Sequence, residues 1–86
     1  LPHMGWNNIN VDDNDSKLLS GVNKKRFYFL HSYHVISQNK DIQIASAEYG
    51  GRMLAAASKK NIFGCQFHPE KSHSAGLQVL ENFSKI

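Results

Sequence analysis

The chain has 86 residues, of which 41% are hydrophobic and 20% charged, and a formal net charge of +3; this composition allows one small soluble domain or a piece of a larger one. Its single cysteine excludes an internal disulfide, and no apolar run approaches the roughly 18 residues of a membrane span, so we expect a cytoplasmic protein. The basic triplet at 24–26 lacks the interleaved aromatic residues of a nucleic-acid groove and is interpreted as a solvated loop.

The first half of the sequence predicts two strands separated by a polar turn. The letters WNNINV, at 6–11, indicate a short extended segment, and DDNDS, at 12–16, is a cluster of turn-forming residues. The run FYFL, at 27–30, is short and apolar, as a mostly buried strand would be, and it leads into the polar and aromatic cluster HSYHV. Histidine, serine and tyrosine side chains therefore follow the end of a buried strand.

The second half predicts a hairpin, a further strand and a closing helix. Residues 41–49 alternate apolar and polar side chains, stop at two glycines, and are followed by the apolar run RMLAAAS, which is typical of a hairpin. We expect residues 62–67 to form a further strand. Four apolar residues then recur at helical spacing: Val79, Leu80, Phe83 and Ile86. Ser72 or Ser74 can cap that helix, and the apolar strands indicate a sheet that is covered on both faces.

The stretch FGCQFHPEKS, at 63–72, carries the strongest chemical signal in the sequence. Side chains alternate faces along a strand, so Cys65 is expected to point away from His68, toward the phenylalanines on its own face. A thiol in such packing behaves as a small buried hydrophobe, and its pKa rises rather than falls. We therefore predict that Cys65 is structural and is not a catalytic nucleophile.

His68 and Glu70 are placed differently, because the proline between them holds His68 extended and keeps both side chains on one side of the backbone. The carboxylate can then accept the Nδ1 proton of the imidazole and leave Nε2 free as a general base. This is the histidine and acid arm of a nucleophilic triad, without the nucleophile. The alternative is a surface histidine beside a turn.

The remaining histidines do not predict a metal centre. Four histidines could be drawn as a zinc site: His31, His34, His68 and His73. Neither cysteine pairs nor helical spacing support that interpretation. We instead expect Ser32 and Tyr33, which follow an apolar strand, to line a ligand pocket with hydroxyl and backbone groups.

Several separated strings of the sequence resemble one family. GCQFHPEKS, followed by the amphipathic GLQVLENF, is similar to the closing segment of class I, triad-type glutamine amidotransferase domains. PHMGWN and FYFLHSYHV narrow the resemblance to the glutaminase subunits of imidazole glycerol phosphate synthases. The resemblance runs over residues 1–86 and matches only the C-terminal half of such a subunit. It implies that the chain is the C-terminal portion of a single α/β, flavodoxin-like domain, mostly strands and hairpins with one closing helix.

The resemblance also implies roles for individual residues. His68 would be the base that takes the proton of a thiol, and Glu70 would hold its imidazole, while the nucleophilic cysteine and the oxyanion hole belong to the absent N-terminal half. Ser32 and Tyr33 fall where the family contacts bound glutamine. Three residues match positions near the synthase partner and the ammonia passage: Trp6, Tyr28 and Lys71. For Trp6 the alternative is a plain core aromatic.

The implied activity is hydrolysis of glutamine to glutamate and ammonia through a cysteine thioester, without a metal or organic cofactor. The ammonia would pass to a (βα)₈-barrel synthase of histidine biosynthesis. Two alternatives stay open. One is a paralogous amidotransferase subunit that feeds another synthase, such as one for an amino sugar of a surface polysaccharide. The other is an interaction fragment that has no activity, because nothing in the chain supplies the nucleophile.

Overall fold

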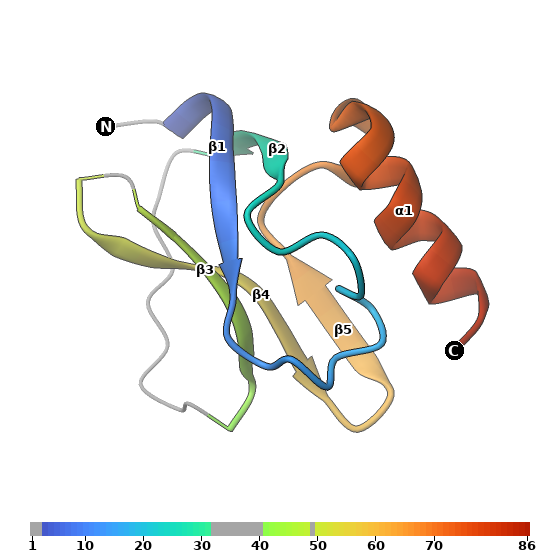
Figure 1. The fold of residues 1–86 in the computed structure, drawn as a ribbon. Helices are drawn as coiled ribbons and strands as arrows, with labels where there is room; N and C mark the ends of the chain where they lie inside the picture. Colours follow the sequence, from blue (N-terminus) through green and yellow to red (C-terminus); the bar gives the residue numbers. More distant parts are fainter. Residues whose placement is uncertain (1–2, 32–40, 49) are drawn as a thin grey trace.

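The computed structural model describes residues 3–31, 41–48 and 50–86, which form a curled antiparallel sheet with a helix beside it (Figure 1). The strands are β1 (His3–Val11), β2 (Arg26–His31), β3 (Gln43–Glu48), β4 (Arg52–Lys59) and β5 (Ile62–Cys65). A short 3₁₀ turn, η1 (Pro69–Lys71), and the helix α1 (His73–Ser84) follow. The strands lie in the order β2-β1-β3-β4-β5, and each neighbouring pair is antiparallel. This mixture of strands and helix fits the expected α/β class.

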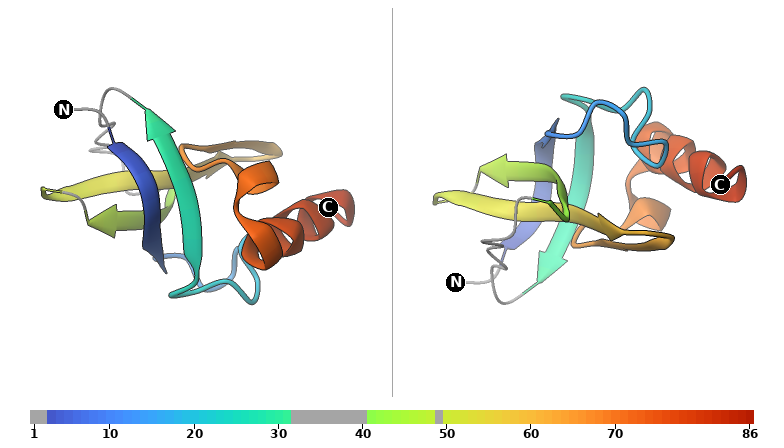
Figure 2. Two further views of the ribbon diagram at one scale, coloured as in Figure 1. Left: turned by 90° about the horizontal axis from the view of Figure 1, so that it is seen from above. Right: turned by 90° about the horizontal axis from the view of Figure 1, so that it is seen from below.

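The two edges of the sheet meet where the chain leaves β5. Although β2 and β5 are the outermost strands, Phe29 of β2 pairs with Phe67, which lies just beyond β5. The backbone N–H of His68 then donates to the carbonyl oxygen of Tyr28, at 2.8 Å. Figure 2 shows β2 beside the segment that leads from β5 to α1. The curl therefore fixes the residues after β5 against β2.

The core lies inside this curl and is rich in aromatic side chains. Phe27, Phe29 and Ile9 are fully buried. The ring of Phe67 packs on Phe27 and Phe29, with centroid distances of 4.3 and 6.0 Å. Because burying a side chain of this size contributes roughly 1.5–3 kcal/mol, the aromatic cluster anchors the residue that directly precedes His68.

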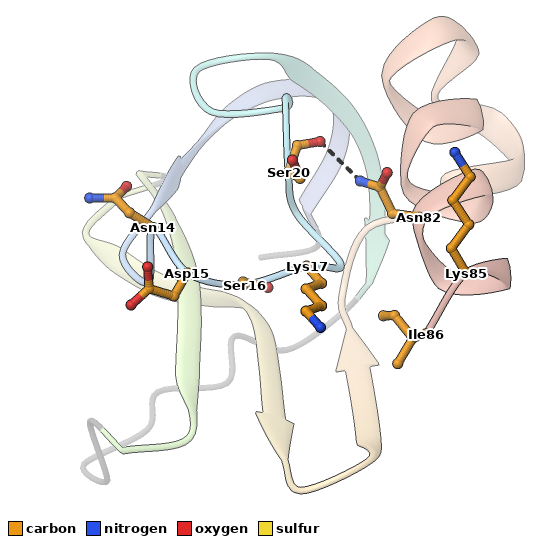
Figure 3. Close-up of a pocket in the computed structure, with 8 residues that line it drawn as sticks. All are labelled: Asn14, Asp15, Ser16, Lys17, Ser20, Asn82, Lys85 and Ile86. Atoms are coloured by element: carbon orange, nitrogen blue, oxygen red, sulfur yellow. Dashed lines mark hydrogen bonds between the residues drawn. The ribbon is translucent and has the colours of Figure 1, made fainter.

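The connection between β1 and β2 also contributes to the core. It contains the polar turn predicted at 12–16, and it buries three side chains that the sequence pattern does not indicate: Leu18, Leu19 and Val22. The side-chain amide of Asn82 donates to the carbonyl oxygens of Leu18 and Ser20, both at 2.9 Å, and the bond to Ser20 is drawn in Figure 3. These bonds tie the C-terminal part of α1 to the connection.

Two expectations about the strands are wrong. The hairpin predicted from 41–49 onward is present as β3 and β4, but buried and exposed side chains do not alternate within β3, because Ile44 to Ala47 are buried consecutively. The register shifts within this stretch, and the curled sheet covers both faces of β3. The strand predicted at 62–67 ends at Cys65, because Phe67 leaves β4 and pairs with β2.

The predicted helix is present, but its expected inner face is wrong. Val79 is 3% exposed, whereas Leu80, Phe83 and Ile86 are 45%, 56% and 53% exposed. The helix contacts η1 and β2, and the ring of Phe83 meets that of Phe63 with the centroids 6.2 Å apart. Among the described residues these contacts bury Val79 but leave most of the apolar face exposed. Within the described ranges, no helix has both the length and the apolar character needed to cross a membrane.

Candidate active site after strand β5

The segment after β5 turns at Pro69 and brings the side chains of His68 and Glu70 together. His68 is extended, with φ −103° and ψ 100°, as a residue before proline tends to be. The 3₁₀ turn then carries Glu70 back toward it, and Nδ1 of His68 lies 3.2 Å from Oε2 of Glu70. The predicted placement of imidazole and carboxylate on one side of the backbone is confirmed.

The carboxylate of Glu70 is suited to holding the imidazole. Its pKa is lowered, first by a hydrogen bond from its own backbone N–H and then by the hydrogen bond with His68, while the charge of Lys71 adds a smaller effect. Glu70 is therefore ionised at neutral pH and can only accept a hydrogen bond. Nδ1 of His68 must then carry the proton in this contact, which leaves the lone pair of Nε2 available as a base.

A buried hydroxyl holds the backbone of this turn. Ser72 is 1% exposed, and its Oγ donates to the carbonyl oxygen of His68 at 2.6 Å and accepts from the N–H of Tyr28 at 2.9 Å. The expectation that Ser72 or Ser74 caps α1 with its side chain is wrong. Ser72 stands at the cap position without a capping bond, because its hydroxyl is already bonded to two backbone groups, and Ser74 lies inside the helix.

The helix packs onto the turn at a glycine. Gly76 is buried at the end of the first turn of α1, and its N–H donates to the carbonyl oxygen of Ser72 at 3.2 Å. A Cβ built on Gly76 would lie 1.9 Å from the carbonyl oxygen of Pro69. The first turns of α1 and the turn that carries His68 and Glu70 therefore form one packed unit, which no local pattern in the sequence indicates.

Cys65 lies outside this arrangement. It is exposed, so the prediction that it is buried is wrong; the strand ends at Cys65, and the alternation that would place it between two buried phenylalanines ends with the strand. The surrounding protein still raises the pKa of the thiol, first by desolvation and then through the negative charge of Glu70. A raised pKa disfavours the thiolate that a nucleophile requires. Among the described side chains, no hydrogen bond joins Cys65 to His68.

The other predicted residues are placed as follows. Trp6 is 39% exposed, so it is not enclosed in the core, and its ring lies 5.8 Å from that of Tyr28 and 5.0 Å from that of His73. The guanidinium of Arg26 lies 5.2 Å from the centroid of the Trp6 ring, and a cleft between these groups borders Ser72. Lys71 is exposed in η1. Two further predicted residues, Ser32 and Tyr33, lie outside the described residues.

A pocket elsewhere on the molecule does not coincide with the predicted site. It lies between the connection after β1 and the C-terminal end of α1, and it is bordered by Asp15, Lys17 and Lys85 (Figure 3). None of the predicted site residues that the structure describes lines it. Within the described part of the chain, no group of three or more His, Cys, Asp or Glu side chains is arranged to hold a metal ion.

The fold and the His68–Glu70 pair agree with one class of protein. The chain belongs to the class I glutamine amidotransferase family, whose model matches residues 1–86. It is 49% identical over 86 residues to imidazole glycerol phosphate synthase subunit HisH of Methanothermobacter thermautotrophicus, covering all of this chain and 42% of the relative. It is 44% identical over 87 residues to imidazole glycerol phosphate synthase subunit HisH 2 of Pseudomonas aeruginosa, covering all of this chain and 43% of the relative. It is 43% identical over 86 residues to imidazole glycerol phosphate synthase subunit HisH of Bacillus subtilis, covering all of this chain and 40% of the relative. The chain thus spans less than half the length of these curated relatives.

Proposed function

We propose that the protein is the glutaminase subunit of an imidazole glycerol phosphate synthase and that this chain supplies the histidine and glutamate of its Cys-His-Glu triad. The observation that carries the proposal is the contact of His68 Nδ1 with Glu70 Oε2 at 3.2 Å. The turn that carries both residues is fixed to β2 by the hydrogen bond from the N–H of His68 to the carbonyl oxygen of Tyr28 and by the bond from the N–H of Tyr28 to Ser72 Oγ. Identity of 42% to 49% to HisH subunits along the chain supports this choice of family member.

The proposed reaction uses His68 twice. Nε2 of His68 takes the proton of a cysteine thiol supplied by the rest of the domain, and the thiolate attacks the side-chain carbonyl carbon of glutamine. The C–N bond then breaks, His68 gives its proton to the departing nitrogen, and ammonia leaves an acyl-thioester behind. Water, deprotonated by His68, hydrolyses the thioester to glutamate. Glu70 stabilises the imidazolium that forms in both halves of the reaction. The chemistry requires neither a metal nor an organic cofactor.

We infer that the chain is the C-terminal part of a flavodoxin-like amidotransferase domain whose remaining part carries the nucleophile. The match to 40–43% of its relatives' length supports the view that the chain is one part of a longer domain, and the placement at the C-terminal end rests on the resemblance of the sequence around His68. The apolar side chains that the described part of the chain leaves open also support it. Ile62 is 72% exposed, Leu77 68% and Phe83 56%, and large apolar side chains left this exposed are expected to be covered by other protein when they lie together. The remainder of the domain would cover α1 and the edge at β5.

The proposed partners follow from the same assignment. Trp6, Tyr28 and Lys71 would contact a (βα)₈-barrel synthase that receives the ammonia. An exposed tryptophan beside a tyrosine, with a lysine on the neighbouring turn, is typical of interface anchors. Ser32 and Tyr33, which directly follow β2, would bind glutamine; this part of the proposal depends on the resemblance alone. A dry passage between the subunits would keep ammonia from becoming ammonium in water.

The test is glutamine hydrolysis by the intact subunit, with and without the barrel synthase. We expect the intact subunit in the complex to release equal amounts of glutamate and ammonia, and residues 1–86 alone to release none, because the base has no thiol to deprotonate. Mixing residues 1–86 with the remaining part of the subunit is expected to restore turnover. An intact complex without glutaminase activity would refute the proposed function. Turnover by residues 1–86 alone would refute only the claim that the nucleophilic cysteine lies in the remaining part of the domain.

Cys65 provides a separate test of where the nucleophile lies. Cys65→Ser in the intact subunit is expected to leave kcat for glutamine hydrolysis within about twofold of the wild-type value, because an exposed thiol with no bond to His68 contributes little. The matched control is cysteine to serine at the nucleophile of the remaining part, which is expected to abolish turnover. Loss of activity in Cys65→Ser alone would show that the thiolate comes from β5.

A further inference from the structure

We propose that Ser72 is a positioning residue for the general base, fixing the backbone of His68 through its buried hydroxyl so that the imidazole keeps its place. This inference rests on the proposed function, because it assigns His68 the role of base. The residue lies between the 3₁₀ turn and the helix, where a serine is normally interpreted as a helix cap. In this structure the hydroxyl serves the turn instead of the helix.

Three hydrogen bonds form a closed circuit between β2 and the turn. The N–H of His68 donates to the carbonyl oxygen of Tyr28 at 2.8 Å. The N–H of Tyr28 donates to Oγ of Ser72 at 2.9 Å, and Oγ of Ser72 donates to the carbonyl oxygen of His68 at 2.6 Å. A hydroxyl has one proton to donate and lone pairs to accept with, so Ser72 can make both of its bonds at once. The peptide groups on both sides of the His68 Cα are therefore fixed.

The hydroxyl of Ser72 accepts a hydrogen bond that no strand of the sheet accepts. β2 is an edge strand, so the outward N–H of Tyr28 has no neighbouring strand to accept it, and Ser72 takes that place. Ser72 is 1% exposed, so in the intact protein its hydroxyl, and not bulk water, makes these bonds. Without Ser72 Oγ the carbonyl oxygen of His68 keeps its bond from the N–H of Lys71, at 3.0 Å. That bond lies within the turn and does not tie it to β2.

The side chain of His68 depends on this backbone because Glu70 restrains only one end of the imidazole. The contact with Glu70 is at the surface, where the carboxylate side chain is 61% exposed, and it fixes Nδ1 without fixing the Cα from which the ring extends. A small displacement of the Cα would move Nε2 relative to a thiol held by another part of the domain. Displacements of about 1 Å can cost a catalytic step as much as 100-fold.

The experiment is Ser72→Ala in the intact subunit assembled with its synthase partner. We expect kcat for glutamine hydrolysis to fall roughly 10-fold to 100-fold, with KM for glutamine within about threefold of wild type, because proton transfer is affected and substrate binding is not. Rates are expressed per folded protein, measured by circular dichroism. The matched control is Ser46→Ala, which removes the other buried serine among the described residues, on β3; it is expected to change neither parameter.

Coupling to His68 separates positioning from a general loss of structure. If Ser72 acts only through the imidazole, Ser72→Ala should cause no further loss of rate in a His68→Ala background. Ser72→Cys retains a side chain of similar shape with a weaker donor, and its kcat is expected to lie between those of wild type and Ser72→Ala. A wild-type kcat in Ser72→Cys would overturn the proposal even if the alanine variant does not fold.

The outcomes distinguish this inference from the proposed function. Undiminished kcat in Ser72→Ala, in a protein where His68→Ala is inactive, would overturn the positioning role and leave the function standing. An equal fractional loss in the wild-type and His68→Ala backgrounds would also overturn it, because the effect would not pass through the base. Full activity of His68→Ala itself would instead refute the proposed function.

Discussion

His68→Ala in the intact subunit is expected to lower glutamine hydrolysis by about 1,000-fold or more while leaving binding to the synthase partner largely unchanged. Without the imidazole no group takes the proton of the attacking thiol or returns it to the departing ammonia. The side chain of His68 is 35% exposed and pairs with a carboxylate at the surface, so its removal leaves the aromatic core intact. Ammonia release measures the first expectation, and co-purification with the synthase measures the second.

The companion variant for this test is His68→Gln, which retains a polar side chain of similar reach but cannot act as a base near neutral pH. It is expected to be as inactive as His68→Ala and to unfold at a temperature close to that of wild type. Normal ammonia release by either variant would remove His68 from the mechanism. Loss of synthase binding in both variants would instead show that the turn belongs mainly to the subunit interface.

Local features of the sequence predict most of the described elements. The strands β1 and β2, the hairpin of β3 and β4, and the helix α1 are all expected within a few residues of where they lie, because apolar spacing and glycine turns act over short stretches of chain. The contact of His68 with Glu70 is predicted for the same reason. It depends on the geometry of three consecutive residues, of which the middle one is proline.

The incorrect expectations share a long-range cause. Cys65 is exposed and β5 ends early because the next residues cross to β2, where Phe67 pairs with Phe29. No periodicity within 62–67 encodes that crossing. The same closure directs the hydroxyl of Ser72 away from the helix terminus and toward Tyr28. A serine before a helix is an ordinary capping signal, so its contact with an edge strand is visible only in three dimensions.

The helical face is a related case. The spacing of apolar residues correctly indicates a helix but does not specify what covers it. Among the described elements, η1 and β2 make most of the contacts with α1, and Phe63 of β5 adds a ring contact with Phe83. Leu77 and Phe83 therefore remain largely exposed. If the rest of an amidotransferase domain covers this surface, as we propose, the apolar residues of α1 are buried in the complete fold. They are exposed here because the 86 residues of this chain do not cover them.

Gly76→Ala is expected to destabilise the intact subunit by about 2–4 kcal/mol, although glycine to alanine within a helix usually stabilises by about 0.5–1 kcal/mol. The sign reverses because the new Cβ would lie 1.9 Å from the carbonyl oxygen of Pro69 and 2.8 Å from its carbonyl carbon. Both are backbone atoms, so no side-chain rotation relieves the clash. Either α1 must move away or the turn with His68 and Glu70 must shift, and kcat for glutamine hydrolysis should fall together with stability.

The matched control for this substitution is Gly64→Ala on β5, where a Cβ would have no atom within 4 Å. It is expected to change the free energy of unfolding by less than about 0.5 kcal/mol. Urea unfolding of both variants measures the difference, and glutamine hydrolysis at a temperature where both are folded separates displacement of the turn from loss of folded protein. Equal stability and equal kcat in the two variants would show that α1 does not rest on the Pro69 carbonyl. Glutaminase activity would then be independent of how closely the helix approaches the turn.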